Sequence, residues 1–599
     1  MRKYHYLKPN ARSETPRWAL FVDTEAVRQR FHPRVEEQHL WFGYAELWRI
    51  YSAHPNKATM QGALTFKDAA ELFKWVLARI PSKSKVYTFA HNWQYDAAML
   101  SIDTVLPELG FTVTKLLVDS NIFILDARIG NKTLALRDTT NLYPFALGSL
   151  GEVFGIPKLE YPDGITDESV WVEYCKRDVS IVREAVMRWL AFIGEHDLGN
   201  IQPTLASQAF TAYRHRFMGA RILVHANLES LALERDSYHG GRVECFYVGQ
   251  YNEPVVSMDV NAMYPFVMSC EVYPTKLKAL VNNLTPAQLD GYLNDYCVTA
   301  RVHIDTDEPV YPFKHEKRLI FPVGSFTTTL STPELVHALE RGHVKAVYQA
   351  SLFEYASIFE SYVDYFYALR QTYKSAGNST YSYIAKLFLN SLYGKFGQSA
   401  RGWVYSDEDE EPPNGELFWY VAAFDNPDIV KHRSLFGRVQ KLIREGESYN
   451  SCPAIAAHVT AYARMYLWEI IQRAGPNNVL YCDTDSVFVT TDGSRNIAHY
   501  VGETRIGGLK IETVGESIKI NGLKDYEFAG KRVLKGISSR AVQIDEHTYR
   551  QQQFAKWSVL VSLGVSGKIL VRDTVKHLAR RYTKGEVGPE GWVTPYCLP

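Results

Sequence analysis

The feature that most constrains this chain is a pair of aspartates, Asp483 and Asp485, set between two apolar runs at 479–482 and 487–489. Both runs are rich in β-branched residues, which predicts two buried strands joined by a tight turn. Alternation along a strand places the two carboxylates on one face. Apolar strands make such a pair costly to desolvate, and a divalent cation relieves the repulsion. A turn whose aspartates make local hydrogen bonds is the alternative.

Composition limits the classes of protein that need to be considered. At 599 residues the chain is long enough for roughly three to four domains. Its 66 basic and 66 acidic residues cancel, so a polyanionic partner has to be bound by local patches. The seven cysteines form no CxxC pair, which gives no zinc motif and fits a reducing compartment. Without an apolar leader or an apolar run of about 18 residues, we expect a soluble, cytoplasmic protein with no membrane partner.

Polar residues also follow apolar runs in the N-terminal third of the chain. The run 18–22 predicts a buried strand that ends at Asp23-x-Glu25, and 85–90 predicts a second strand. A helix follows, with Asn92 as a candidate N-cap and Asp96 in its first turn. The stretch 134–140 predicts a strand that runs into a polar turn containing Thr139. An amphipathic helix over 169–189 carries Tyr174 and Asp178 on one face, where the alternative is a tyrosine at the core edge and a solvated aspartate.

Together these segments supply four carboxylates, a phenol and an amide on alternating strands and helices. Such a set can hold two divalent ions that activate water against a phosphodiester, while the tyrosine orients the water. The three segments resemble the exonuclease motifs of the DnaQ-like 3′→5′ proofreading domains, with Tyr95 where that family more often has Phe. The resemblance implies three roles: catalysis by Asp23, Glu25, Asp96, Tyr174 and Asp178, metal binding by Asp23, Glu25 and Asp178, and DNA contact by Asn92, Tyr95 and Thr139.

A third carboxylate for the opening pair lies far upstream. The run 254–258 predicts a buried strand that ends at Asp259, followed by a tight turn at Tyr264 and a helix whose first turn holds Pro265. The alternative is an ordinary strand-end aspartate and a core tyrosine.

The pattern becomes helical from 353 to 396 and is broken at 375–379, which predicts an antiparallel helical hairpin. Lys386, Asn390 and Tyr393 fall on one face of its second helix, where they can meet a triphosphate, a sugar and a base. Gly394 leaves room for close approach. A solvated face is the alternative.

Four other stretches carry weaker signals. Tyr238-x-Gly240-Gly241 allows a close backbone approach, although it can also be a simple turn. The segment 403–444 predicts an excursion with a solvated acidic loop at 407–413. Between 510 and 540, seven basic residues outnumber four acidic ones, and Lys524 and Tyr526 suit a nucleic-acid track. The pattern over 540–599 predicts a helical end to the chain.

In order, Asp259-x-x-x-x-Tyr264-Pro265, Lys386-x-x-x-Asn390-Ser391-x-Tyr393-Gly394 and Tyr481-x-Asp483-Thr484-Asp485-Ser486 resemble motifs A, B and C of family B DNA polymerases. Tyr238-x-Gly240-Gly241 and Lys524-x-Tyr526 are similar to signatures of the protein-primed branch. One departure is Ala262, where phage relatives often have Ser. The resemblance implies catalysis by Asp259, Asp483 and Asp485, metal binding by these three and Val260, nucleotide binding by Val260, Tyr264, Lys374, Lys386, Asn390 and Tyr393, and DNA contact by Tyr238, Gly240, Gly241, Ser391, Gly394, Lys524 and Tyr526.

The expected fold is mixed α/β, with an RNase H-like exonuclease domain (1–195) and a right-hand polymerase domain (196–599). The expected parts of the second are a palm at about 200–304 and 446–535, insertions at about 305–355 and 399–445, fingers at about 356–398 and a thumb at about 536–599. The resemblance implies two Mg²⁺ ions per site, with Mn²⁺ as a substitute. It also implies that a monomer binds primer-template DNA, dNTPs and a terminal protein. Alternatives are extension of ordinary nucleic-acid primers, a reverse transcriptase or RNA polymerase, and a non-catalytic nucleic-acid binder.

Overall fold

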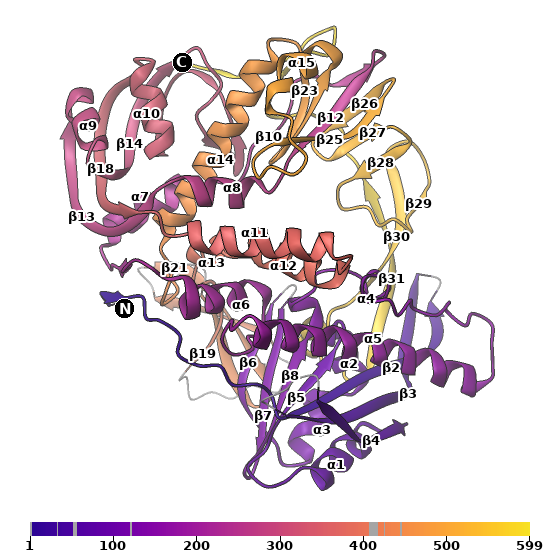
Figure 1. Ribbon diagram of the computed structural model, residues 1–599. Coiled ribbons are helices and arrows are strands. Elements are labelled where there is room, and N and C mark those ends of the chain that lie inside the picture. The colour runs from indigo at the N-terminus through magenta and orange to yellow at the C-terminus, as the bar shows by residue number, and fades with distance from the viewer. Residues whose placement is uncertain are drawn as a thin grey trace.

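The computed structural model describes residues 3–32, 34–51, 57–119, 122–406, 417–423, 426–443 and 446–599. The acidic loop expected at 407–413 lies outside them. The N-terminal segments form one half of the molecule, and sheets from the middle of the chain form the other. The two helices over 360–391 lie across the space between them (Figure 1). No helix in the described ranges is long and apolar enough to cross a membrane.

The apolar run before Asp23 begins a long strand, β2 (Trp18–His32), so the strand end predicted at Glu25 is wrong. β2 pairs with antiparallel β3 (Val35–Ile50), and this pairing carries the polar residues after Glu25 as strand. The register shifts between Glu25 and Ala26, which places an irregularity directly after the two carboxylates. The start of β2 also pairs in parallel with β5 (Lys85–Ala90).

The sheet around β2 has strands from both ends of the chain. Its order is β29, β30, β31, β3, β2, β5, β8, β7, β6, and β4 pairs with β3. The remaining bounds are β4 (Ala58–Phe66), β6 (Thr112–Asp119), β7 (Ile122–Ile129), β8 (Lys132–Asp138), β29 (Val542–Gln543), β30 (Thr548–Phe554) and β31 (Lys568–His577). Its helices are α1 (Ala69–Arg79), α2 (Trp93–Met99), α3 (Ile102–Glu108), α4 (Leu147–Phe154) and α5 (Glu168–Glu195).

The C-terminal strands correct the expectation of a helical C-terminus. Beyond residue 540 the short helix α16 (Trp557–Ser562) is accompanied by β29 to β31, β32 (Gly585–Val587), β33 (Val593–Pro595) and β34 (Cys597–Leu598). β31 pairs with β3, and Trp557 is fully buried in the core beneath the N-terminal sheet. β31 could not be found from the local pattern, because its partner β3 lies near the opposite end of the chain. In Figure 1 the yellow strands run from the upper half down to this sheet.

Helix α5 joins the two halves through opposite faces. Val179, Val182 and Val186 pack against the N-terminal sheet. Trp189 faces the other core, where its ring stacks on Phe388 at 5.3 Å between centroids. α5 extends beyond the predicted 169–189 at its C-terminal end, where Phe192 and Ile193 are buried in the same core as Trp189.

The Asp483–Asp485 stretch lies in a sheet of order β10, β23, β24, β12, β25. The bounds are β10 (Val243–Cys245), β12 (Val255–Val260), β23 (Val479–Asp483), β24 (Ser486–Thr490) and β25 (Leu509–Gly515). The predicted hairpin is thus confirmed. Helix α15 (Thr491–Asn496) packs on β12 and β24, and α14 (Pro453–Ala474) packs against α15, α8 (Met263–Cys270) and α7 (Leu228–Ser237). Beside it lies a sheet of β11 (Gly249–Tyr251), β26 (Ile518–Gly522), β27 (Asp525–Phe528) and β28 (Lys531–Leu534).

A separate sheet has the order β13, β18, β14, β17, β34. Its bounds are β13 (Tyr273–Leu284), β14 (Cys297–Thr306), β17 (Val323–Ser331) and β18 (Val344–Ala356), with α9 (Pro286–Leu293) and α10 (Thr332–Glu340). The insertion boundary predicted at about 305 falls inside β14. Small pairs are β1 (His5–Tyr6) with β9 (Leu223–Val224), β15 (Phe313–His315) with β16 (Arg318–Ile320), and β32 with β33.

The predicted helical hairpin is confirmed as α11 (Glu360–Ser375) and α12 (Ser379–Ser391), followed by α13 (Tyr393–Phe396). It starts later than expected, because β18 continues to Ala356. α6 (Leu205–Ala212) packs beneath it. The excursion after it forms a sheet of β19 (Gly402–Tyr405), β22 (Arg438–Ile443), β21 (Asn426–Leu435) and β20 (Leu417–Ala423). Leu435 enters the core of the N-terminal half.

Candidate active sites

The turn of the β23–β24 hairpin is fixed by backbone hydrogen bonds on both sides. Thr484 has a left-handed backbone (φ 65°), and its N–H donates to the carbonyl of Arg242 at 2.7 Å. The carbonyl of Asp485 accepts the N–H of Val260 at 2.7 Å. Asp485 thus lies in the turn, so the expectation that it shares a strand face with Asp483 is wrong. The turn instead directs Asp485 toward the end of β12, where Asp259 stands opposite Ser486.

Asp259 and Asp485 form a mutually repelling acidic pair. Burial first, and then the charge of Asp485, raise the pKa of Asp259 to about 7. Burial also raises the pKa of Asp485. Both raised pKa values mean that the protein does not fully stabilise the ionised carboxylates. For Asp259, the positive charges of Lys386 and Lys510 offset only part of the increase in pKa. A divalent cation between oxygen ligands supplies that compensation.

A cavity of about 490 Å³ opens beside this pair. It brings together residues from β12, the fingers helices and the hairpin: Asp259, Val260, Tyr264, Lys386, Asn390, Tyr393 and Asp485. The predicted shared face of Lys386, Asn390 and Tyr393 therefore faces the acidic pair. Tyr264 lies in the first turn of α8, not on the turn before it, and its ring is 4.6 Å from that of Tyr393. The two rings form part of the cavity wall.

Sequence reasoning missed some lining residues and included one that does not line this cavity. Arg370, Lys510 and Glu512 line it, whereas Lys374, one turn after Arg370 on α11, does not and is exposed. Arg370 stands four positions before Lys374, so helical spacing was the signal that could have found it. A nucleotide-binding role for Lys374 stays a prediction.

Asp483 has a different environment from Asp485. Its Oδ2 lies 3.1 Å from Lys524 Nζ and 3.4 Å from the Tyr481 hydroxyl, which donates to it. Tyr526 packs against the Tyr481 ring at 5.4 Å. Lys524-x-Tyr526 thus supports the back of the hairpin. In the predicted nucleic-acid track, Lys510, Lys524 and Arg532 are paired with acidic residues, which reduces the excess positive charge open to DNA.

The Tyr238-x-Gly240-Gly241 segment lies against the catalytic turn. A Cβ on Gly241 would stand 2.7 Å from Thr484 Cγ2, whereas one on Gly240 would meet nothing within 4 Å. Tyr238 packs on Gly397 at the end of the fingers. The buried Arg464 donates to the carbonyls of His239 and Gly240 at 3.0 Å. The paired glycines therefore allow this segment to lie close to the β23–β24 hairpin, in addition to any contact with DNA.

We expect Gly241→Ala to displace Thr484 and with it Asp485, because the added methyl group overlaps a β-branched side chain. The cost should be about 1–3 kcal/mol of unfolding free energy, with a large loss of nucleotide addition. Thermal unfolding and a primer-extension assay measure the two effects. Gly240→Ala is the matched control, since its methyl group enters open space. Equal effects of both substitutions would contradict the contact.

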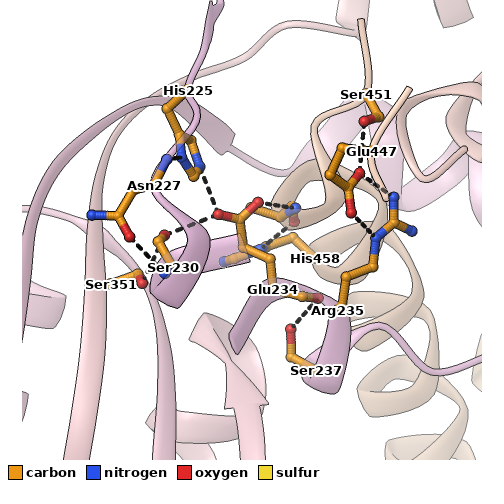
Figure 2. A network of polar contacts seen from close by, with 11 residues as sticks. His225, Asn227, Ser230, Glu234, Arg235, Ser237, Ser351, Glu447, Ser451 and His458 are labelled. Atoms are coloured by element: carbon orange, nitrogen blue, oxygen red, sulfur yellow. Dashed lines mark hydrogen bonds and ion pairs between the residues drawn. The ribbon is translucent and has the colours of Figure 1, made fainter. Parts of the chain in front are cut away.

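Figure 2 shows how α7, which leads into this segment, is anchored. Glu234 is buried and accepts from His225 at 2.6 Å, Ser230 at 3.0 Å and the backbone N–H of Ala454 at 3.1 Å. Arg235 forms an ion pair with Glu447 and donates to the carbonyl of Gly397 at 2.6 Å. α7 thus makes hydrogen bonds both to the start of α14, through Glu234, and to the end of the fingers, through Arg235.

Two predicted DNA-contact residues, Ser391 and Gly394, line a second cavity of about 710 Å³. Its other wall includes Lys115, Thr140 and Asn141 of the N-terminal half. Thr139 is fully buried, and its hydroxyl donates to the carbonyl of Ala90 at 3.1 Å. This hydrogen bond fixes the loop after β8 and holds the Thr139 hydroxyl inside the protein.

The second acidic site lies on β2 and α5. Donor atoms of Asp23, Glu25 and Cys175 lie within 4.8 Å of one another. Burial, followed by Asp178, raises the pKa of Asp23 to about 7, and burial, followed by Asp23, raises the pKa of Glu25 to about 9. Asp96 is also buried and accepts from the Thr24 hydroxyl at 2.7 Å. The predicted exonuclease carboxylates are therefore brought to one place.

Asp178 and Tyr174 share a cation that the motif analysis missed. The Lys158 ammonium forms a short ion pair with Asp178 Oδ2 and lies 4.4 Å from the centre of the Tyr174 ring. Asp178 is 3% exposed, so the alternative of a solvated aspartate is wrong. Lys158 comes from a loop 20 residues earlier, and no spacing rule connects it to the helix.

We expect Lys158→Met to lower the rate of 3′→5′ degradation by about 10²-fold, because it leaves Asp178 without its positive partner and Tyr174 without its neighbour. A single-turnover assay on labelled single-stranded DNA measures the rate. Lys176→Met is the control, since Lys176 lies on the same helix as Asp178 and pairs with the exposed Glu173. Equal rates for Lys158→Met and the unaltered protein would exclude a role in degradation.

The helix after β5 begins at Asn92, as predicted, but the Asn92 side chain does not cap it. Instead, Asp138 at the end of β8 accepts the backbone N–H groups of Asn92 and Trp93 at 2.9 and 2.8 Å. Asn92 has a left-handed backbone, φ 74°, and its side chain lines a cavity of about 370 Å³. The Tyr95 hydroxyl donates to Gln38 at 3.0 Å. The tertiary cap leaves the Asn92 amide free to contact a ligand.

Both acidic sites fit divalent metal ions. Asp178 Oδ1 is buried without a hydrogen-bond partner among the described residues, and the carboxylate pKa values are raised at both sites. Unpaired buried oxygens and mutually repelling carboxylates are the donors that hard cations compensate. Asp23, Glu25 and Asp178 fit at one site, and Asp259 and Asp485 with the Val260 carbonyl fit at the other.

The fold and the two acidic sites define the class: a mixed α/β polymerase fold joined to an exonuclease fold. The fold is similar to that of Phi29 DNA polymerase complexed with primer-template DNA and incoming nucleotide substrates, with a TM-score of 0.68 and 17% identity over 94% of this chain and 100% of that one. A sequence model described as DNA polymerase type B, organellar and viral, matches residues 164–457. The chain is similar to this family over the matched residues, which make up just under half of its length.

Two relatives illustrate the sequence likeness. The chain is 25% identical over 548 residues to a probable DNA polymerase of Neurospora intermedia, covering 78% of this chain and 55% of that protein. It is 26% identical over 321 residues to the DNA-directed DNA polymerase of Enterobacteria phage PRD1, covering 51% and 52%. The matches span about half the length of these two relatives. A family B polymerase of the kind matched at 164–457 depends on divalent metal ions.

Proposed function

We propose that the chain is a DNA-directed DNA polymerase with a 3′→5′ proofreading exonuclease. The observation that carries this proposal is the cavity in which Asp259 and Asp485 face Lys386, Asn390 and Tyr393. The carboxylates, with the nearby Lys386 cation, and the amide and phenol that line the same cavity match the metal, triphosphate and sugar of a nucleotide. The known complexes of Phi29 DNA polymerase with primer-template DNA and nucleotides support the same substrates here.

In this mechanism Asp259, Asp485 and the Val260 carbonyl hold two Mg²⁺ ions, for which Mn²⁺ can substitute. When bound, the ions activate the primer hydroxyl and stabilise the leaving pyrophosphate. Lys386 donates to the triphosphate and neutralises charge that develops on it. Asp483, fixed by Lys524, steadies the hairpin. The Tyr264–Tyr393 pair packs beneath the sugar.

In the exonuclease site, Asp23, Glu25 and Asp178 hold two divalent ions, which lower the pKa of the attacking water when bound. Tyr174 orients that water, and Lys158 fixes Tyr174 and Asp178 in place. Asp96 fixes Thr24 between the two acids of β2. Asn92 and Tyr95 contact the frayed strand.

The test of the main proposal is extension of a labelled primer on a DNA template by the purified chain, with Mg²⁺ and dNTPs. Template-directed addition is expected, and chelation should stop it. No addition, or addition that requires an RNA template, would contradict the proposal. The second result would favour a reverse transcriptase.

We further propose initiation from the hydroxyl of a terminal protein, with the chain acting as a monomer in the host cytoplasm on a linear genome. The Tyr238-x-Gly240-Gly241 and Lys524-x-Tyr526 resemblances support this, as does the likeness in sequence to a phage polymerase. Transfer of a labelled dNMP onto a protein encoded beside this gene tests it. Extension of nucleic-acid primers without such transfer would support an ordinary family B polymerase.

We expect Tyr264→Val to raise ribonucleotide addition relative to deoxyribonucleotide addition by at least about tenfold, equivalent to about 1.4 kcal/mol. The reason is that the Tyr264 ring, which packs at a tilt against Tyr393, closes the space that a 2′-hydroxyl would need. The ratio of kcat/KM values for paired nucleotides measures the effect. Tyr264→Phe, which keeps the ring, should retain selectivity. Unchanged selectivity in Tyr264→Val would refute this role.

A further inference from the structure

Among the residues around the exonuclease carboxylates, one has no part in the mechanism above. The Cys175 thiol is fully buried on α5, and its Sγ lies 3.4 Å from Asp23 Oδ2 and 3.5 Å from the Asp23 carbonyl oxygen. It also lies within 4.8 Å of a Glu25 carboxylate oxygen. A soft sulfur donor thus completes a group of three potential ligands whose other members are hard oxygens.

We propose that Cys175 makes the exonuclease site a binding site for a thiophilic divalent cation, Zn²⁺ or Cd²⁺, in competition with Mg²⁺. Zinc binds sulfur at about 2.3 Å and carboxylate oxygen at about 2.1 Å, so tetrahedral geometry separates the two donors by about 3.6 Å. The observed 3.4 Å between Cys175 Sγ and Asp23 Oδ2 is close to this value. The protein therefore needs little rearrangement to hold such an ion.

A further donor is available on the same helix. Asp178 Oδ1 is buried and has no hydrogen-bond partner in the described part of the chain, and the Asp178 charge acts on both Asp23 and Glu25. Asp23 and Glu25 are only partly buried, so the ion reaches the group from the carboxylate side. On binding, the Cys175 S–H bond breaks as the metal–sulfur bond forms, and the proton passes to solvent.

The polymerase site offers no equivalent ligand in the residues that line its described cavity. Cys482 is next to Asp483 in sequence, but its Sγ lies toward the Arg242 carbonyl at 3.9 Å, on the other side of β23. Soft ligands select zinc and cadmium, whereas oxygen sets suit magnesium. Zinc should therefore slow degradation at concentrations that leave extension unaffected. This consequence rests on the proposed exonuclease function, whereas binding of the ion does not.

The test is a Cd²⁺ titration of the full chain, followed by the ultraviolet sulfur-to-cadmium charge-transfer absorption. The exposed Cys270 and Cys597 are first replaced by serine to remove other accessible thiols. We expect a saturable band that Zn²⁺ displaces, and its loss on adding Cys175→Ser. Affinity measured by equilibrium dialysis should fall at least about tenfold, since even residues outside the first ligand shell contribute about 10–100-fold.

Two further variants keep the test decisive if Cys175→Ser does not fold. Glu25→Gln retains the thiol but should weaken the same band, because both residues bind one ion. Cys482→Ser should leave the band intact. A band that survives Cys175→Ser, disappears in Cys482→Ser, or is absent from the Cys270/Cys597 background would overturn the proposal. Each of these readings is independent of whether the chain degrades DNA.

Discussion

Asp485→Asn should abolish primer extension, by about 10³-fold or more, while 3′→5′ degradation continues. The substitution keeps the shape of the side chain and the turn hydrogen bonds, which run through the backbone of Thr484 and the carbonyl of Asp485. It removes one of the two carboxylates of the acidic pair, Asp259 and Asp485, that lines the cavity. Loss of a single preorganised charge-stabilising group already costs about 10²–10³-fold, and here a metal ligand is lost as well.

The measurement is single-nucleotide addition to a primer-template, with degradation of single-stranded DNA followed in the same preparation. Asp492→Asn is the matched control: Asp492 lies on α15 directly after β24, its side chain is 75% exposed, and its partner is the surface residue Arg495. Normal extension by Asp485→Asn would remove this cavity as the polymerising site. Loss of both activities would indicate a folding defect.

Asp23→Ala combined with Glu25→Ala should remove degradation by a similar factor while extension remains. Burial and mutual repulsion raise the pKa of both carboxyls, so their removal also relieves a cost to folding. We therefore expect the metal-free double variant to be at least as stable as the unaltered chain at neutral pH, because a carboxyl whose pKa is raised in the folded state lowers stability at every pH above its unfolded pKa. Degradation assays and thermal unfolding report the two effects separately.

Glu173→Ala is the control for this pair, since Glu173 lies on α5 near the site with its side chain 66% exposed. Persistent degradation by the double variant would place the nuclease elsewhere in the chain. A loss of extension in the same variant would show that the two halves are coupled, for which α5 provides the physical connection through Trp189 and Phe388.

The local elements that carry the chemistry were predictable because their signals are short-range. The hairpin around Asp483 and Asp485, the strand before Asp259 and the helix with Lys386, Asn390 and Tyr393 all follow from strand or helix periodicity. The hairpin α11–α12 followed from a break in helical periodicity at 375–379. Each of these patterns is complete within one short, continuous stretch of the chain.

The elements that were mispredicted depend on distant partners. β2 continues past Glu25 because β3 pairs with it, and the C-terminal strands form because β3 offers its other edge to β31. Lys158 and the cap by Asp138 were missed for the same reason. A lysine in a loop or an aspartate at a strand end has no distinctive local pattern until the fold sets it beside its partner.

By itself, the sequence determined which residues carry charge and which secondary structures present them, because periodicity and residue type are local properties. Only the tertiary structure decided how the two aspartates of the opening pair divide their roles. The left-handed turn at Thr484 directs Asp485 to Asp259 and the cavity. Asp483 instead forms an ion pair with Lys524, because that lysine reaches it from the turn between β26 and β27, 41 positions further along the chain (524 − 483).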